Sequence, residues 1–296
     1  MKVGIDSYSF HRLFGEVYPG LQQEPGRSWR MESDFLDFAR AQDVDEVALE
    51  TLFFDALDDG VCADLNARLD DLGVERVIGW GHPDGLHGGS DEAALEDLKR
   101  HIPVAPKVGA RIMRIVASSM VYVDQPKEPQ IRNTVRMLRE AVEVADAHDV
   151  VLALENHIDF TSREILQILD GVASERLKAN FDTGNALRMY EDPVAAARAL
   201  APHTVSTHTK DIAPLPVGGA PSERFTWWPS CPVGAGQIDM PAVIAALREG
   251  GFDGGLGVEL DLLGPAWAGR DEEDLVAESV SYLKQVLGGS PAGAVS

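Results

Sequence analysis

Four short stretches of the sequence share one pattern, an apolar or β-branched run that ends in a carboxylate or an imidazole. The residues at their ends are Glu155, Asp182, His208 and Glu259. Carboxylate oxygens and imidazole nitrogens are ligands that divalent metals accept in proteins. Because runs of this kind are typical of strands buried on both faces, each stretch predicts an inner strand of a parallel sheet. In parallel α/β folds the chemistry lies at the carboxyl ends of such strands, where these four residues fall.

The alternation of side chains along a strand predicts where the four candidates point. The residues two positions before them are small or polar: Ala153, Asn180, Ser206 and Gly257. The residues directly before them are mostly bulkier: Leu154, Phe181, Thr207 and Val258. In a barrel the small set suits the crowded interior, whereas the bulky set suits packing against the surrounding helices. We therefore expect all four candidates to point inward and to converge at the top of consecutive strands.

Three carboxylates that converge without a counter-charge repel one another, and at least one of them would be forced to protonate. A divalent cation would relieve this repulsion. Three oxygen ligands and one imidazole favour Mn²⁺, while Mg²⁺, Co²⁺ and Zn²⁺ are also compatible. Four protein ligands would leave two octahedral positions for neighbouring oxygens of a substrate. A metal held in this way would polarise a carbonyl group.

The elements that must position these residues are strands and helices that alternate along the whole chain. The predicted strands cover residues 3–7, 46–50, 74–78, 111–116, 150–154, 177–182, 204–208 and 255–259. Eight helix signals follow them, beginning near residues 33, 64, 90, 131, 161, 192, 239 and 271. The pattern predicts an α/β fold, a single (β/α)8 TIM barrel over residues 1–288, with a flexible tail at 289–296. The connection after the seventh strand, residues 211–239, is unusually long, and loops of this length are usually functional.

Composition limits the classes of function that are open. The chain has 48 acidic and 26 basic residues and a formal net charge of −22, which argues against binding to nucleic acid or to an anionic membrane surface. Two cysteines are too few for a disulfide framework and match no Cys-x-x-Cys metal motif. The sequence has no signal-peptide pattern and no run of 18 or more apolar residues. We therefore predict a cytoplasmic protein that acts on a small molecule.

The whole chain resembles the xylose isomerase-like TIM barrels. This family is often labelled sugar phosphate isomerase/epimerase and includes ketose 3-epimerases, hydroxypyruvate isomerase, inosose dehydratase and the catalytic subunits of C-glycoside deglycosidases. The resemblance rests on Glu, Asp, His and Glu at the ends of strands five to eight. It also rests on the flanking motifs Leu-Glu155-Asn-His157, Phe-Asp182-Thr-Gly-Asn185, His208-Thr-Lys210-Asp211 and Pro-Val-Gly234-Ala-Gly236-Gln-Ile-Asp239.

The resemblance implies a metal-dependent sugar isomerase or epimerase that abstracts a proton next to the carbonyl of a ketose or oxo-sugar. In the ketose epimerases two metal-bound glutamates exchange this proton on opposite faces of the substrate, a role that would fall to Glu155 and Glu259. In the deglycosidases a histidine two residues after the first glutamate is a base, and His157 holds that position. The alternative function is therefore a C- or O-glycoside deglycosidase, a lyase that acts on 3-oxo-glycosides. His157 could equally orient a ligand without acting as a base.

Further residues are candidates for binding the sugar or glycoside: His82, Lys210, Trp227, Trp228 and Asp261. Loop packing is the plainer role for tryptophans. Arg114 and Arg188 could bind an anionic substrate, although surface ion pairs are the commoner role of arginine. A metal-dependent nuclease shares the barrel family, and it carries more metal ligands, including several histidines, and a basic face that binds DNA. The net charge of −22 and the presence of only eight histidines oppose that function for this chain. The chain could form a homo-oligomer or, as a deglycosidase, require a small second subunit.

Overall fold

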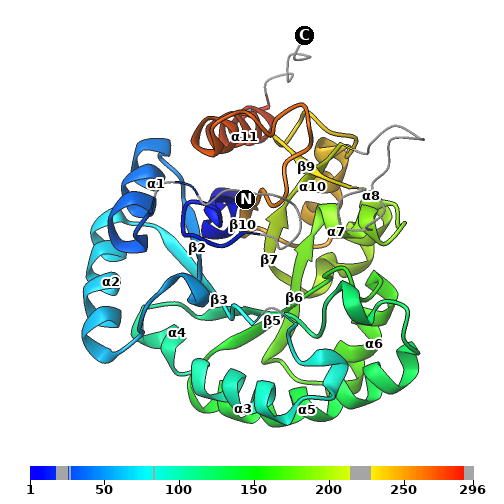
Figure 1. Ribbon diagram of the computed structural model, residues 1–296. Coiled ribbons are helices and arrows are strands. Elements are labelled where there is room, and N and C mark those ends of the chain that lie inside the picture. The colour runs from blue at the N-terminus through cyan, green and yellow to red at the C-terminus, as the bar shows by residue number, and fades with distance from the viewer. Residues whose placement is uncertain (18–25, 27, 83, 214–227, 290–296) are drawn as a thin grey trace.

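Eight parallel strands close into a barrel in the computed structural model, which describes residues 1–17, 26, 28–82, 84–213 and 228–289 (Figure 1). The eighth barrel strand carries the label β10 because two short strands precede it in the chain. The barrel strands are β1 (Lys2–Asp6), β2 (Glu46–Glu50), β3 (Glu75–Gly79), β4 (Ile112–Ile115), β5 (Val151–Glu155), β6 (Leu177–Asp182), β7 (Thr204–Thr209) and β10 (Gly255–Val258). The predicted TIM barrel is confirmed.

The register of the strands aligns the ends of the sequence motifs. Each strand pairs with its neighbour along the chain, and β10 closes the ring between β7 and β1. On β6 and β7, Asp182 is paired with His208, and His208 is paired in turn with Gly257 on β10. A register shift between Ala179 and Asn180 precedes this alignment. The carboxyl ends of β5, β6, β7 and β10 therefore meet at one side of the barrel mouth.

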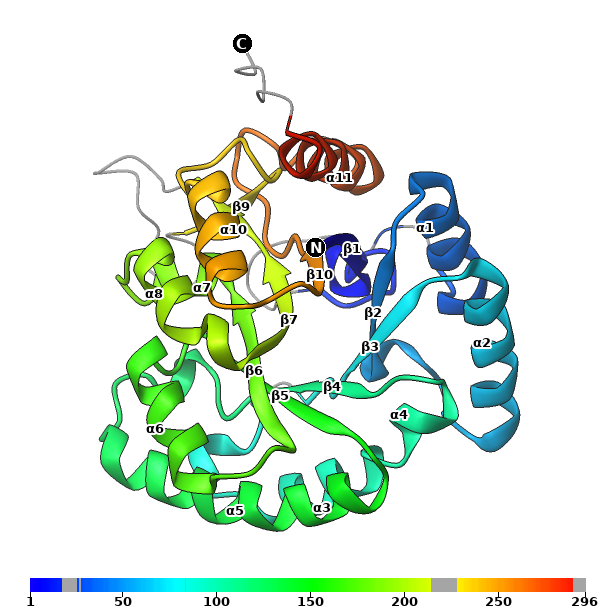
Figure 2. The same ribbon diagram turned by 180° about the vertical axis from the view of Figure 1, so that it is seen from behind.

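Helices surround the barrel on its outside (Figures 1 and 2). They are α1 (Leu36–Gln42), α2 (Asp59–Leu72), α3 (Glu92–His101), α4 (Val104–Lys107), α5 (Lys127–Ala147), α6 (Ser162–Val172), α7 (Thr183–Arg188), α8 (Pro193–Leu200), α10 (Met240–Glu249) and α11 (Glu272–Leu287). Side-chain caps fix several helix starts, as the sequence predicts. Thr161 and Glu164 form a capping box at α6, and Asp192, Asp239 and Asp271 cap the helices that follow them. These starts set the lengths of the loops that reach the barrel mouth.

The hydrophobic core lies between the strands and the helices. Leu154, Phe181 and Val258, which directly precede three of the candidate ligands, are fully buried in this core. Asn180 and Ser206 lie on the alternate face and hydrogen-bond to each other through Ser206 Oγ and Asn180 Oδ1, 2.7 Å apart. Polar pairing on one face and apolar packing on the other follow the alternation expected of barrel strands.

Three details of the fold differ from the sequence prediction. Helix α2 begins at Asp59, about one turn before the predicted start, because Asp58 accepts hydrogen bonds from the backbone of Gly60 and Val61. Two short helices, α4 and α7, lie between predicted elements. The long connection contains an antiparallel pair, β8 (Asp211–Ile212) and β9 (Ser230–Cys231). Its residues 214–227 and most of the predicted tail lie outside the described residues. None of the helices in the described ranges has the length and apolar character needed to cross a bilayer.

Candidate metal and active site

The four candidate ligands come together at the carboxyl end of the barrel, and all four are buried. Glu155, Asp182 and His208 each offer one ligand atom, and these three atoms lie within 4.8 Å of one another. Glu259 follows β10 and joins the same cluster, with its Oε2 atom 2.8 Å from His208 Nδ1. We refer to these four residues as the quartet. The expected convergence of the four strand ends is therefore present.

Asparagine side chains hold two of the quartet in place. Asn156 Nδ2 donates to the carbonyl oxygen of Asp182 at 2.8 Å, and the Asp182 amide donates back to Asn156 Oδ1 at 2.8 Å. Asn185 Nδ2 donates to Glu155 Oε1 at 3.0 Å and to Asp182 Oδ2 at 2.9 Å. Asp182 also caps α7 by accepting from the amide of Asn185. The backbone and the carboxylates of β5 and β6 are thereby fixed relative to each other.

Asp6, at the end of β1, determines how His208 presents its ring. Its Oδ2 atom lies 3.1 Å from His208 Nε2. A carboxylate beside one ring nitrogen favours a proton there and leaves the other nitrogen for a metal. That other nitrogen, Nδ1, faces oxygens of Glu155, Asp182 and Glu259 at 3.5, 3.8 and 2.8 Å. The sequence prediction missed Asp6, which lies one residue before the end of a predicted strand and ends β1 in the structure.

Lys210 places a cation beside the carboxylates. Its buried ammonium lies 3.1 Å from Asp182 Oδ2, 3.2 Å from Glu259 Oε1 and 3.1 Å from Asp261 Oδ2. The backbone amide of Lys210 donates to Thr183 Oγ1, whose hydroxyl donates to the Lys210 carbonyl. The premise that the carboxylates lack a counter-charge was therefore wrong, because this chain supplies one itself.

Two arginines complete the charged network, and both are buried rather than in the surface ion pairs that are their commoner role. Arg188 donates from Nη2 to Asp261 Oδ1 at 2.9 Å and to the carbonyl of Trp228 at 2.8 Å. Arg114 pairs with Glu50 at the end of β2, and its Nε lies 3.6 Å from Glu155 Oε2. Glu50 was also missed from the sequence, although it too ends a predicted strand.

The charges of the site strongly shift its pKa values. Burial opposes ionisation of Glu259, but Lys210 and His208 lower its pKa to about 2. Burial likewise opposes ionisation of Glu155, yet the charge of His208 holds its pKa well below the usual value. Burial, reinforced by the charges of Glu259 and Glu155, raises the pKa of Asp182 to about 6. Against the effect of burial, Glu259 and Glu155 raise the pKa of His208 well above its ordinary value.

The donor set fits a divalent cation. His208 Nδ1 and Glu259 Oε2 are buried and close together, yet neither makes a hydrogen bond to any described residue. Three oxygen donors and one imidazole are a ligand set for Mn²⁺, Mg²⁺, Co²⁺ or Zn²⁺. Because metal ligands must be deprotonated, binding of a cation would release the proton that the His208 imidazolium retains at neutral pH.

A cavity of about 670 Å³ opens above the quartet. This volume lies within the range of roughly 300–1,000 Å³ that is usual for small-molecule sites. Three of the residues predicted to bind substrate line it, namely His82, Lys210 and Asp261, and so does His157. The Nδ1 atom of His157 is buried and has no hydrogen-bond partner among the described residues, and burial lowers the pKa of this imidazole.

The predicted tryptophans do not strengthen the site. Trp228 is absent from the described lining of the cavity, and its ring lies edge-on to Tyr190 with centroids 6.0 Å apart. Its carbonyl oxygen nevertheless binds Arg188. Trp227 lies outside the described residues. Trp80 is buried and donates through Nε1 to Asp97 Oδ2 at 2.9 Å, as expected of a packing residue.

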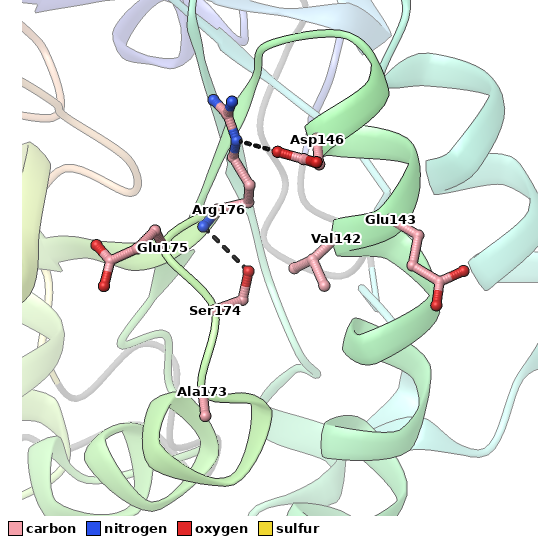
Figure 3. Close-up of a pocket in the computed structure, with 7 residues that line it drawn as sticks. All are labelled: Val142, Glu143, Asp146, Ala173, Ser174, Glu175 and Arg176. Atoms are coloured by element: carbon pink, nitrogen blue, oxygen red, sulfur yellow. Dashed lines mark hydrogen bonds and ion pairs between the residues drawn. The ribbon is translucent and has the colours of Figure 1, made fainter.

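Figure 3 shows a second hollow, which lies on the outer surface between α5 and the segment before β6. Its one cationic side chain, Arg176, donates through Nε to Asp146 Oδ1 at 2.8 Å and also pairs with Asp149. The two aspartates are exposed, Arg176 is half-buried, and all three are close to the amino end of β6, away from the quartet. Because its cation is already paired, this hollow is a weaker candidate than the barrel mouth.

Similar sequences occur in curated proteins. The chain is 25% identical over 193 residues to the uncharacterized protein YihM of Escherichia coli K12, which covers 62% of this chain and 55% of that protein. The chain thus spans about half the length of this relative. It is 24% identical over 254 residues to a 3-oxo-isoapionate decarboxylase of Pectobacterium atrosepticum, with 84% of this chain and 81% of that enzyme covered.

Solved structures share the fold. An L-ribulose 3-epimerase superposes with a TM-score of 0.74 at 19% identity and covers 97% of this chain and 95% of its own. The IOLI protein, solved with a bound zinc atom, superposes with a TM-score of 0.69 at 17% identity and covers 98% of this chain and 99% of its own. At these identities the likeness shows the barrel architecture alone. Family membership rests instead on the sequence, because residues 36–286 match one family over most of the chain, and the protein belongs to the xylose isomerase-like TIM barrels.

Proposed function

We propose that this protein is a divalent-metal-dependent enzyme that abstracts a proton next to the carbonyl group of a ketose or oxo-sugar. The observation that carries the proposal is the buried convergence of Glu155, Asp182, His208 and Glu259 on one point beneath the cavity. Clusters of carboxylates with shifted pKa values inside a cleft are typical of functional sites. Membership of a family that includes sugar isomerases and epimerases supports the same class of reaction.

The quartet would hold the cation, and Mn²⁺ fits its oxygen-rich donor set best. When bound, such an ion would polarise the substrate carbonyl and acidify the neighbouring carbon. Asp6 would keep the proton of His208 on Nε2, and Asn185 would keep Glu155 and Asp182 oriented. Lys210 would donate a hydrogen bond to a substrate oxygen from within the cavity that it lines.

Glu155 and Glu259 are the proposed proton carriers. Both are held as carboxylates at neutral pH, since their pKa values are lowered by the cations around them. They lie on strands separated by β6 and β7, so a substrate between them would meet one glutamate on each face. Removal of the proton by one carboxylate, and delivery to the opposite face of a proton that the other has first taken up from water, would invert the carbon, which is an epimerisation.

His157 supports a second candidate, a lyase that acts on 3-oxo-glycosides. Its buried Nδ1 atom lacks a hydrogen-bond partner in the described part of the chain, and its side chain lines the cavity. As a base it would take the proton at C2 of the oxo-sugar, and the electrons of that C–H bond would expel the aglycone from C1. In this reaction Glu155 and Glu259 would act as metal ligands only.

The relative named 3-oxo-isoapionate decarboxylase is compatible with both candidates. Loss of carbon dioxide from a 3-oxo acid leaves an enolate, and abstraction of a proton next to a carbonyl leaves the same type of anion. A site that stabilises such an anion could therefore serve any of these reactions, and the choice depends on the group that leaves the carbon.

Metal analysis and isotope exchange test the proposal. The purified protein should contain about one divalent ion per chain, and Glu155→Gln, Asp182→Asn and Glu259→Gln should each lose it. Incubation in D₂O with ketohexoses, and separately with 3-oxo-glucosides, separates the candidates: exchange without release indicates an epimerase, and release of the aglycone indicates a lyase. Full metal retention in all three variants would contradict the metal site.

A further inference from the structure

Several of the side chains that line the cavity are apolar. Its lining includes Leu52 after β2, Val116, Met120 and Val121 after β4, and Ile158 after β5. We call these five residues the apolar shelf. Leu52 is 42% exposed and Val121 is 66% exposed, and only one other large apolar residue of the described chain, Tyr190 at 74%, is as accessible.

Polar contacts hold the loops of the shelf in place while these side chains remain exposed. The Gly81 amide donates to Thr51 Oγ1 at 2.9 Å, which ties the loop after β3 to the loop that bears Leu52. A Cβ atom on Gly81 would approach the Cβ of Leu52 to 2.7 Å, so Leu52 packs directly over this glycine. The two loops therefore support each other beneath the apolar surface.

The turn that bears Met120 and Val121 is fixed in a similar way. Ser119 Oγ donates to Asp84 Oδ1 at 2.6 Å, and the Tyr122 hydroxyl lies 2.8 Å from His87 Nδ1. Gln130 Nε2 donates to the carbonyl of Tyr122 at 3.1 Å. The residues on either side of Met120 and Val121 are thus bonded to the protein, whereas Val121 itself is exposed. A fixed apolar surface beside a polar site is typical of a place where a ligand binds.

We propose that the substrate carries an apolar, ring-sized group joined to its sugar, and that this group binds the apolar shelf while the sugar faces the quartet. This inference rests on the proposed function, because it takes the reacting sugar to lie at the quartet. Both surfaces line one continuous cavity of about 670 Å³, so one molecule can contact them together. The polar residues of the cavity would bind the hydroxyl and carbonyl groups, and the shelf would remove the apolar group from water.

The mixed lining of the cavity favours such a two-part ligand over a free sugar. Charged groups at the strand ends, among them Lys210, Glu259 and Glu155, share the cavity with the shelf, which comes from the loops after β2, β4 and β5. A free ketose offers hydroxyl groups on every side, so Leu52 and Val121 would face polar groups that they cannot bind. An aromatic or alicyclic substituent matches them, because removal of apolar surface from water stabilises the complex in proportion to the area covered.

The test compares two ligands that differ only in the apolar group. Binding of phenyl and methyl 3-oxo-β-glucoside to the Mn²⁺-loaded protein is measured by calorimetry at a temperature where turnover is negligible. Wild-type protein should bind the phenyl compound at least about tenfold more tightly. In the double variant Leu52→Asn/Val121→Asn the ratio of the two affinities should fall towards one, while affinity for the methyl compound stays unchanged. Tyr190→Asn, which removes an exposed apolar ring outside the cavity lining, should keep the wild-type ratio.

Equal affinity for the two compounds in wild-type protein, or no measurable binding of either, would overturn the proposal. So would a wild-type preference that the double variant retains. If wild-type protein is a dimer that the double variant dissociates, a second copy of the chain covers the shelf and the inference is wrong. Binding and turnover are measured separately. A preference for the phenyl compound without proton exchange or aglycone release would support the apolar shelf and contradict the proposed reaction. Exchange or release without a preference for the phenyl compound would support the reaction and contradict the shelf.

Discussion

The barrel encloses buried glutamates at both of its ends, and their surroundings differ sharply. At the carboxyl end, Glu155 and Glu259 lie beside His208 and Lys210, and both have lowered pKa values. At the amino end of β2, burial and the neighbouring charge of Glu75 raise the pKa of Glu46 to about 7. Cations lie beside Glu155 and Glu259 and are scarce around Glu46.

At the amino end, the side chain of Glu46 is packed against two glycines. Gly4 and Gly255 leave space for Glu46, since a Cβ atom on Gly255 would lie only 2.2 Å from its Oε1 atom. The carboxylate is thus packed in place of larger side chains on two neighbouring strands. In TIM barrels the carboxyl end of the strands carries catalysis and the amino end carries stability. Glu155, Glu259 and Glu46 are all buried, so the cations beside the first two, rather than burial, distinguish them from Glu46.

The largest expected effect comes from exchanging glutamate for glutamine at the two ends. Glu259→Gln should lower proton exchange into the substrate in D₂O by roughly 10³-fold, because general acid–base groups contribute about 10²–10⁴-fold. It should also reduce bound metal, as measured by elemental analysis. Glu46→Gln is the matched control, and it should keep both the metal and the activity. Equal losses of metal and of proton exchange in the two variants would contradict the proposed difference between the two ends of the barrel.

Removal of the cation at the carboxyl end should cost stability. Lys210→Met leaves Asp182, Glu259 and Asp261 without their shared ammonium, and loss of one partner from a buried ion pair costs roughly 3–5 kcal/mol. Urea unfolding of metal-free protein measures this, and added Mn²⁺ should restore part of the loss. Lys178→Met, which breaks an exposed pair with Glu175, should cost less than about 1 kcal/mol. Similar unfolding free energies for the two variants would contradict the proposed role of Lys210.

The role of His157 can be separated from metal binding. His157→Gln should lower release of aglycone from 3-oxo-glucosides by roughly 10²-fold if this imidazole is the base, and bound metal should not change. His148→Gln, at an exposed histidine that follows α5, is the control and should have no effect. Undiminished release in His157→Gln would remove the base from the lyase mechanism and leave His157 as a group that orients its neighbours.

The smallest effect concerns the amino end and its pH dependence. Because the folded-state pKa of Glu46 is raised from 4.5 to about 7, the folded protein binds more protons than the unfolded chain between these two values. Wild-type stability should therefore fall as the pH rises through this window. Glu46→Gln removes the contribution of Glu46 to this slope and should make the protein more stable than wild type above pH 7, by roughly 1–3 kcal/mol. Urea unfolding at pH 5 and pH 8 measures the difference, and a variant that is less stable at pH 8 would count against it.

The sequence predicts the barrel and the quartet because both depend on local pattern. An apolar run that ends in Glu155 or Asp182 is enough to predict a buried strand. The alternation of side chains along that strand then predicts that the final carboxylate points into the barrel. The contacts between distant strands follow no local pattern. Asp6 meets His208 across the junction of β1 with β10 and β7, and Glu50 meets Arg114 across β3, so both pairs depend on the register and closure of the barrel.

The same reason explains why the charge of the site was misjudged from the sequence. Lys210 follows β7 and lies two residues after His208, so the same alternation makes it face the cavity. The carboxylates that Lys210 contacts depend on the register between β6, β7 and β10. No local sequence pattern predicts this register. The signal for Asp6 and Glu50, an acid at or next to the end of a predicted strand, is nevertheless present in the sequence.

The amide pair between Asn156 and the backbone of Asp182 has a consequence for the entropy of ion binding. These two hydrogen bonds, like those between Thr183 and Lys210, fix the main chain beneath the ligands without using any ligand atom. The ordering of this main chain is therefore complete once the barrel has folded. An arriving ion has only side-chain torsions left to restrict, so its association should lose little conformational entropy and require no rearrangement of the strands.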